Sequence, residues 1–279
     1  MFNSSNLIGV KYSTPPSSPK SMLTKNVLDN TSKPQHLPLT DLFKAKPLEK
    51  VIGKAQMPEY KEFVGKYVTL RKVENEDIDQ LYQLTHGSQE LEQVWKYMTT
   101  GPFNSCDEMK SFYQSQIKAS DKLVFCVHDK NANKPIGIAC LLDINPGMAS
   151  VEIGALWYTV TSQHTEANTE VTYLLIKHCI EDLGFRRIVW KCNNENVPSK
   201  KAAIRLGFEF EGLFYNHMIV KGVNRDTAWF GLIDKKWPMI APNYEKWLSV
   251  PNAKDRDSLA KMNAEVPKFS AVTMLDLSQ

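Results

Sequence analysis

The sequence has no apolar run of about 18 residues, the length that a membrane-spanning helix needs, and no C-x-x-C pair. Its first ten residues, Met1–Val10, lack the charged start and long apolar centre of a secretory signal. We therefore expect no membrane partner and a location in the cytoplasm or the nucleus. Disulfides and a metal site are also not expected, because the five cysteines are scattered and odd in number: Cys106, Cys126, Cys140, Cys179 and Cys192.

Net positive charge is confined to the N-terminal segment. Residues 1–57 hold eight lysines and three acids, a charge of +5, whereas the whole chain carries +3. The remainder is therefore slightly acidic, and a nucleic-acid-binding domain would instead place a basic face on its folded part. Nucleic acid is not expected as the main ligand, although association through the basic tail stays open as an alternative.

Composition divides the chain into three parts. Residues 1–57 are rich in proline and serine and lack apolar periodicity, which predicts a disordered basic tail. Residues 58–248 are predicted to form one domain, and residues 249–279, which are polar, a flexible C-terminal tail. An apolar content of 42% is ample for a buried core in the middle part.

Apolar periodicity within the predicted domain indicates an α+β fold. The expected strands are Tyr67–Arg71, Leu123–His128, Pro135–Asp143, Ala149–Tyr158, Arg187–Cys192, Tyr215–Lys221 and Arg225–Leu232. The expected helices are Asn75–His86, Ser105–Ala119, Glu170–Leu183 and Pro198–Leu206.

The loop Thr161–Asn168 joins an expected strand to an expected helix. Unpaired amides and the helix dipole favour an anion at such a helix start. Loops that bind anions this way usually contain glycine, because the backbone must approach the ligand closely. This loop contains none and carries Glu166 in its middle. The pattern therefore predicts an anion site whose strength depends on where Glu166 points.

Seven short motifs follow one another between Phe63 and Trp237. They are Glu152-Ile153-Gly154, Gln163-x-x-x-x-Asn168-Thr169-Glu170, Asn196-x-x-Ser199, Leu206-Gly207-Phe208, Glu211-Gly212, Arg225-Asp226-Thr227 and Asp234-x-x-Trp237. In this order they resemble the GNAT superfamily of acetyl-CoA-dependent N-acetyltransferases, and within it the RimJ/RimL-like branch. The resemblance covers neither tail.

The resemblance implies a mixed, mostly antiparallel, splayed seven-stranded sheet flanked by about four helices. Its fourth and fifth strands would diverge to admit acetyl-CoA as co-substrate. The implied cofactor-binding residues are Leu156, Trp157 and Tyr158 at a strand bulge, Gln163, His164, Thr165, Glu166, Ala167, Asn168 and Thr169 around the pyrophosphate, and Asn196 and Ser199 beside the pantetheine arm or the thiolate.

Glu166 departs from the family pattern, in which glycine is common at this position. A carboxylate about 4 Å from the pyrophosphate would cost about 4 kcal/mol at an effective dielectric constant of 20. The cost disappears if the side chain points to solvent, because the implied contacts come from backbone amides. Asn168 tolerates left-handed backbone angles and can also cap the helix.

Two residues are the candidate catalytic groups. Glu152, in an apolar strand beside the implied cleft, is placed to remove a proton from the attacking amine directly or through water. The alternative for Glu152 is an edge position or a pairing with an arginine. Ser199 is placed near the thiol, and its alternative is a helix cap, because it follows Pro198 at a helix start.

The acceptor groove is expected between the loop His86–Asn104 and the hairpin Phe214–Arg225, with Trp95, Tyr215 and His217 as substrate-binding residues. The predicted function is direct transfer of acetyl from acetyl-CoA to a primary amine: a protein N-terminus, an amino acid or a small amine. The alternative is an inactive binding or regulatory module with a degraded pyrophosphate loop. A monomer or homodimer is expected.

Overall fold

The computed structural model describes residues 55–251 and 253–269. Within these ranges one sheet has the strand order β1-β2-β3-β4-β5-β6-β8-β7. Its strands are β1 (Phe63–Val64), β2 (Val68–Lys72), β3 (Leu123–Asp129), β4 (Lys134–Asn145), β5 (Ser150–Tyr158), β6 (Arg187–Asn193), β7 (Glu209–Val220) and β8 (Val223–Ile233). The α-helices are α2 (Asn75–Thr85), α3 (Gln89–Glu92), α4 (Cys106–Ile117), α5 (Ala167–Lys177), α6 (Val197–Arg205), α7 (Trp237–Ser249) and α8 (Leu259–Ala264).

The expected α+β class and open, mostly antiparallel sheet are confirmed, but the element numbers were wrong. The described residues form eight strands and seven α-helices, where seven strands and about four helices were expected. The added strand, β1, pairs with β2 over two residues only and carries no periodic pattern. Helix α7 was missed because Pro238 and Pro242 suggest a break. Pro238 lies in the first turn, where its missing N–H costs nothing, and apolar burial along α7 outweighs Pro242.

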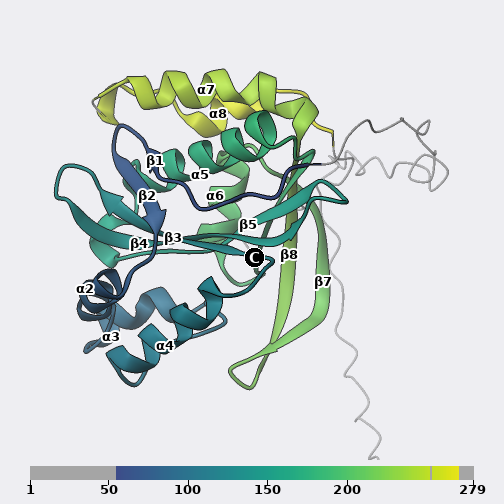
Figure 1. Cartoon of the computed structure of the whole chain (residues 1–279). Helices are drawn as coiled ribbons and strands as arrows, with labels where there is room; N and C mark the ends of the chain where they lie inside the picture. The colour runs from purple at the N-terminus through teal and green to yellow at the C-terminus, as the bar shows by residue number, and fades with distance from the viewer. Residues whose placement is uncertain (1–54, 252, 270–279) are drawn as a thin grey trace, which may run out of the picture. The chain divides into compact units, whose positions relative to one another are not determined.

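Helices cover both faces of the sheet. Figure 1 shows α2, α3 and α4 on one face, and α5, α6, α7 and α8 on the other. Alternate residues of one strand enter different cores: Phe125 packs with the α5 side, whereas Val124 and Cys126 pack with the α2 side. This alternation follows from the two-residue period of a strand.

The sheet opens in its middle. Strands β5 and β6 pair in parallel only from Ser150 to Glu152, opposite Arg187 to Val189. Beyond Glu152, β5 continues along β4 to Tyr158, whereas β6 continues along β8 to Asn193. The two strands therefore diverge, as the family resemblance predicts for its fourth and fifth strands.

The segment assigned to a C-terminal tail contains a folded helix. Leu259 of α8 is buried at 1% exposure, and the side-chain amide of Asn263 donates to the Arg205 carbonyl at 2.9 Å. A short stripe of Leu259, Met262 and Val266 supplies the apolar contact. The predicted N-terminal tail lies outside the described residues up to residue 54, and the Gln56 amide donates to the Leu183 carbonyl at 2.8 Å. None of the helices in the described ranges is long and apolar enough to cross a membrane.

Candidate functional site

A cavity of about 210 Å³ lies where β5 and β6 separate. Four parts of the fold line it: β5, β6 with the start of α6, the β7–β8 hairpin, and the loop that follows Trp95. The lining residues most relevant to chemistry are Glu152, Gly154, Leu156, Lys191, Asn196, Ser199, His217, Arg225, Thr227, Tyr97 and Thr99. The structure thus brings Glu152, Leu156, Asn196, Ser199 and His217 of the predicted residues to one space.

A bulge in β5 forms the cavity wall beside Glu152. Residues Ala155 and Leu156 lie opposite the single residue Ala139, because Gly154 pairs with Cys140 and Trp157 with Ile138. Ala155 has a φ of 47°, in the left-handed region. A bulge leaves backbone groups without a ladder partner, so this stretch can offer its amides to a ligand.

Of the three predicted bulge residues, only Leu156 lines the cavity. Trp157 is buried in the α2-side core, where its Nε1 donates to the Tyr113 hydroxyl at 2.9 Å. Tyr158 is also buried, and its hydroxyl lies 3.4 Å from Asn168 Oδ1. The bulge therefore lies one to two residues earlier than the resemblance suggests.

Glu152 is a buried carboxyl whose pKa lies far above its usual range. Burial raises its pKa to about 7, against the opposing attraction of Lys191. The Lys191 ammonium lies 2.5 Å from Glu152 Oε2 and 2.7 Å from Asp143 Oδ2, so one cation is shared by two acids. Such a carboxyl is close to half ionised at neutral pH and can accept a proton there.

The start of α6 carries Asn196 and Ser199 at the cavity edge. Asn196 is the N-cap, and its Oδ1 accepts the Ser199 amide at 3.1 Å. Ser199 Oγ in turn accepts the Trp190 indole N–H at 3.1 Å. Both side chains therefore stabilise the helix start and also line the cavity, so the two interpretations from the sequence coexist.

Glu166 points to a cation rather than to solvent. Its Oε1 lies 2.6 Å from Arg256 Nη1, in the segment between α7 and α8. The Arg256 guanidinium stacks over Trp247 at 4.5 Å and donates to the Tyr67 hydroxyl at 3.0 Å. Glu166 itself has a φ of −67°, so the missing glycine causes no strain at this position. The left-handed residue of the loop is His164, with a φ of 61°.

The remaining loop residues organise the start of α5 and do not line the cavity. Gln163 Nε2 donates to the Tyr158 carbonyl at 3.3 Å, and Thr165 Oγ1 donates to the Ser162 carbonyl at 2.8 Å. Ala167 begins α5, so Asn168 lies inside the helix and does not cap it. Thr169 is buried, and its Oγ1 accepts from Arg205 at 2.9 Å.

The predicted acceptor residues have different positions. Trp95 is 1% exposed and belongs to the α2-side core, with its indole N–H donating to the Thr85 carbonyl at 3.1 Å. Tyr215 is 74% exposed and does not line the cavity. His217 does line it, and its Nδ1 lies 3.0 Å from Thr227 Oγ1. The expected groove walls are nevertheless present, because Lys221 of the hairpin donates to the Trp95 carbonyl at 2.8 Å.

Sequence reasoning missed four charged residues near these sites. Lys191 and Asp143 join Glu152, Arg256 joins Glu166, and Arg225 lines the cavity. A lysine inside an apolar strand was a usable signal for Lys191, and Arg225 lies in a recognised motif. Arg256 offered no signal, since it lies 90 residues from Glu166.

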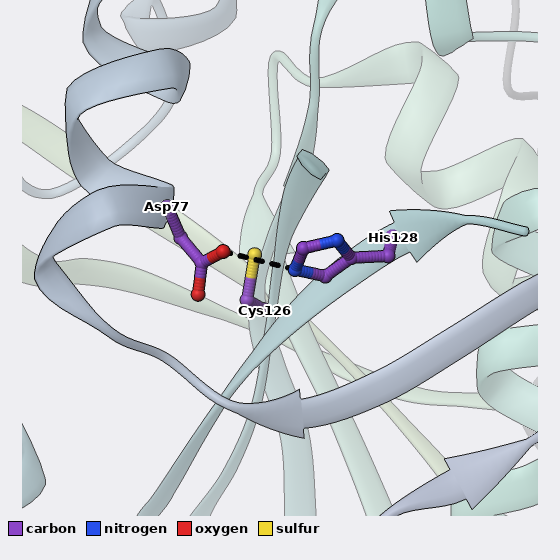
Figure 2. A group of neighbouring side chains, drawn as sticks. All are labelled: Asp77, Cys126 and His128. Carbon is purple, nitrogen blue, oxygen red and sulfur yellow. Dashed lines mark ion pairs between the residues drawn. The ribbon is translucent and has the colours of Figure 1, made fainter. Parts of the chain in front are cut away.

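A second cluster of titratable side chains lies on the α2 side of the sheet. Figure 2 shows Asp77 and His128 pointing toward one another beside Cys126, with Asp77 Oδ1 and His128 Nε2 3.0 Å apart. These three residues are of types that ligate metals, and their ligand atoms lie within 4.8 Å of one another. Asp77 Oδ1 also accepts from Arg71 at 2.7 Å, and Oδ2 accepts the Glu74 amide at 3.0 Å. Because the guanidinium already holds this carboxylate, we assign the cluster a structural role.

Comparison with known proteins identifies the family. The sequence model of the acetyltransferase (GNAT) domain matches residues 68–209. An uncharacterized N-acetyltransferase p20 of Bacillus licheniformis is 29% identical over 175 residues, which are 61% of this chain and 94% of that protein.

Solved structures share the fold. A GCN5-related N-acetyltransferase from Brucella melitensis has a TM-score of 0.72 and 33% identity, covering 76% of this chain and 98% of its own. A spermidine N-acetyltransferase from Vibrio cholerae, in complex with CoA and spermine, has a TM-score of 0.52 and 20% identity over 62% of this chain and 99% of its own. With the splayed sheet and the cavity at its opening, these matches show that the chain belongs to the GNAT family of acetyltransferases.

Proposed function

We propose that this protein transfers the acetyl group of acetyl-CoA directly to a primary amine, as an enzyme of the RimJ/RimL-like branch. The observation that carries the proposal is Glu152: a buried carboxyl with a pKa of about 7, lining a cavity beside a backbone bulge. An amine acceptor agrees with the spermidine acetyltransferase of the same fold, which was solved with CoA and spermine.

The bulge supports a role for backbone amides in polarising the thioester carbonyl. Amide groups freed at Ala155 and Leu156 would hold the thioester carbonyl and the oxyanion that forms when the amine attacks it. Gly154 leaves room for the Glu152 carboxyl next to the bulge, because a Cβ there would lie 2.5 Å from Glu152 Oε1. Leu156, Trp157 and Tyr158 are kept as the proposed backbone contacts, with Leu156 at the cavity.

Proton transfer is assigned to Glu152. The amine forms the new N–C bond, the C–S bond of the thioester breaks, and the carboxylate accepts the proton that the amine loses. Lys191 holds the carboxylate in place. Asn196 and Ser199, across the cavity, are proposed to face the departing thiolate, which takes up a proton from water, directly or relayed through the Ser199 hydroxyl, which regains its own proton from water.

The loop before α5 fits a pyrophosphate once Arg256 is taken into account. Amides at the helix start remain the proposed contacts, from His164 through Thr169, although the Ala167 amide already donates to Thr165 Oγ1 at 3.3 Å. Glu166 is neutralised by Arg256 at 2.6 Å, so the repulsion that its charge would cause is largely removed. This pairing takes away the feature that favoured an inactive binding module.

Titration calorimetry with acetyl-CoA, followed by turnover on a panel of amines and N-terminal peptides, tests the proposal. We expect saturable binding and acetylation of at least one amine, with mass spectrometry locating the acetyl group. Absence of acetyl-CoA binding at millimolar concentration would overturn the enzyme assignment. Binding without turnover of any amine would favour the regulatory alternative.

A further inference from the structure

Arg225 is a buried cation that lines the cavity; Glu152 attracts it at longer range, but no described residue forms a hydrogen bond or ion pair with its side chain. It is 8% exposed and lies on β8, two residues before Thr227 and so on the same strand face. Its side chain makes no hydrogen bond or ion pair with any residue that the structure describes, and its Nε is a buried nitrogen without a hydrogen-bond partner. The guanidinium therefore has donors available within the cavity.

The lack of a partner is specific to this position. Among the described residues, the other lysines and arginines buried to the same degree are Lys200 and Lys236. Lys200 Nζ donates to Asn194 Oδ1 at 3.2 Å, and Lys236 Nζ donates to Glu209 Oε1 at 2.6 Å. The fold thus satisfies its buried cations elsewhere and leaves one unsatisfied at the cavity.

An unpaired buried guanidinium favours an anion that is not among the described residues. Arginine carries five N–H donors and no acceptor, and it keeps its charge even when burial lowers its pKa, as burial does for Arg225. Buried charges in folded proteins are normally paired. Glu152, which also lines the cavity, is already held by Lys191 at 2.5 Å.

The position of Arg225 assigns that anion to the acceptor. Arg225 and His217 belong to the hairpin, which with Tyr97 and Thr99 forms the walls of the expected acceptor groove. The proposed acetyl-CoA contacts lie on other elements, at the β5 bulge and the starts of α5 and α6. A planar guanidinium pairs best with a carboxylate, through two parallel hydrogen bonds.

We propose that Arg225 binds a carboxylate of the acceptor, so that the substrates are small amines that carry a carboxylate, such as amino acids. The inference rests on the proposed acetyltransferase function and narrows its substrate class.

The test compares amino acids with their C-terminal amides, which keep the amine and lose the carboxylate. For the wild-type protein we expect kcat/KM to be about 10- to 100-fold higher for the acids, the range of a charge-assisted hydrogen bond. The variant Arg225→Gln should lose this preference through a higher KM for the acids, while the amides react as before. Arg225→Lys keeps the positive charge but loses the paired N–H donors of the guanidinium, so it should retain part of the preference for acids.

Two controls separate the possible explanations. Thermal unfolding shows whether each variant is folded, and Lys201→Gln removes an exposed charge from α6 without touching the cavity. Equal rates for acids and amides in the wild-type protein would overturn the proposal. So would an Arg225→Gln variant that loses acetyl-CoA binding in calorimetry, because Arg225 would then serve the cofactor.

Failure of the proposed function has a different signature. If no amine is acetylated, calorimetry with the amino acids and their amides, in the presence of CoA, still tests the carboxylate site. Binding of the acids that Arg225→Gln abolishes would support the site in a protein without the activity. Binding of neither ligand class by the wild-type protein would overturn it.

Discussion

Asp77 and Glu152 are two buried carboxyls beside a cation, yet their pKa values move in opposite directions. Burial raises both, but only Asp77 has enough partners to reverse the effect: His128, the Glu74 amide and Arg71 bring its pKa below the usual value. Glu152 has one cation, Lys191, which it shares with Asp143; burial and the neighbouring Asp143 carboxyl outweigh the attraction of Lys191, and the pKa of Glu152 rises to about 7. The hydrogen bonds and ion pairs of the fold therefore stabilise the charge of Asp77 fully, whereas the charge of Glu152, at the cavity, is stabilised only in part.

The largest effect that distinguishes the two carboxyls is expected when Glu152 is neutralised. Glu152→Gln keeps the shape and removes the base, so we expect kcat to fall by about 10²–10⁴-fold, the usual contribution of general base catalysis. Steady-state kinetics with acetyl-CoA measures the loss. Full activity in the variant, with unchanged acetyl-CoA binding, would remove Glu152 from the mechanism and make its raised pKa a consequence of packing alone.

The pH dependence sharpens the contrast, because the two groups titrate in separate windows. Activity should fall about tenfold per pH unit below a pKa of about 7, as Glu152 becomes protonated, and Glu152→Gln should lose this limb. Measuring kcat/KM as a function of pH for the wild-type protein and for Glu152→Gln tests this expectation.

Stability should show opposite slopes for the two carboxyls. For Glu152 the folded pKa exceeds the unfolded one, so its contribution to stability falls as pH rises from about 4.5 to 7. For Asp77 the folded pKa is lowered, so its contribution is present above about 3.8 and is lost as pH falls through the folded pKa. Denaturant unfolding of Glu152→Gln and Asp77→Asn across pH measures both, and equal slopes would contradict the assignment.

Neutralising Asp77 should affect stability rather than turnover. Asp77→Asn leaves Arg71 and His128 without their shared acceptor and removes a capping contact, so we expect a loss of about 1–3 kcal/mol in the free energy of unfolding. Urea denaturation measures it. Asp79→Asn, on the same helix and half-exposed beside Lys110, should change stability little. A loss of kcat without a loss of stability in Asp77→Asn would reverse the roles of the two carboxyls.

Glu166 is a third case. It lies beside a proposed ligand site, like Glu152, and its charge is balanced by one cation, Arg256, which is distant in the sequence but in contact in the fold. Arg256→Gln frees its charge, and we expect acetyl-CoA affinity to fall about tenfold, less than full repulsion would cause because Glu166 can turn to water. The double variant Glu166→Gln with Arg256→Gln should recover the affinity. Calorimetry at two salt concentrations measures it, and an Arg256→Gln variant with unchanged affinity at low salt would contradict the coupling.

Local patterns predicted much of the fold, and the structure shows where they stop. The strands from Leu123 to Tyr158 were predicted because their alternation is short-ranged, and the family that the motifs suggested is confirmed. Trp95 illustrates the limit: an aromatic residue in an acceptor loop was expected at the groove, yet it is buried in the core while Tyr97 lines the cavity. Sequence spacing does not reveal which of two nearby aromatics turns inward.

The sequence by itself determined most of the elements between Val68 and Ile233, the family and the positions of Glu152, Asn196 and Ser199 at the opening of the sheet. These depend on periodicity, caps and motifs that act over a few residues. Only the tertiary structure decided the charge partners. Glu166 pairs with Arg256 from 90 residues away, Glu152 pairs with Lys191 across the splayed strands, and Arg225 has no hydrogen bond or ion pair with a described residue. Pairing depends on distances that arise only when remote segments pack together. These pairings set the pKa values of Glu152 and Asp77, and they leave Arg225 available to a ligand in the cavity.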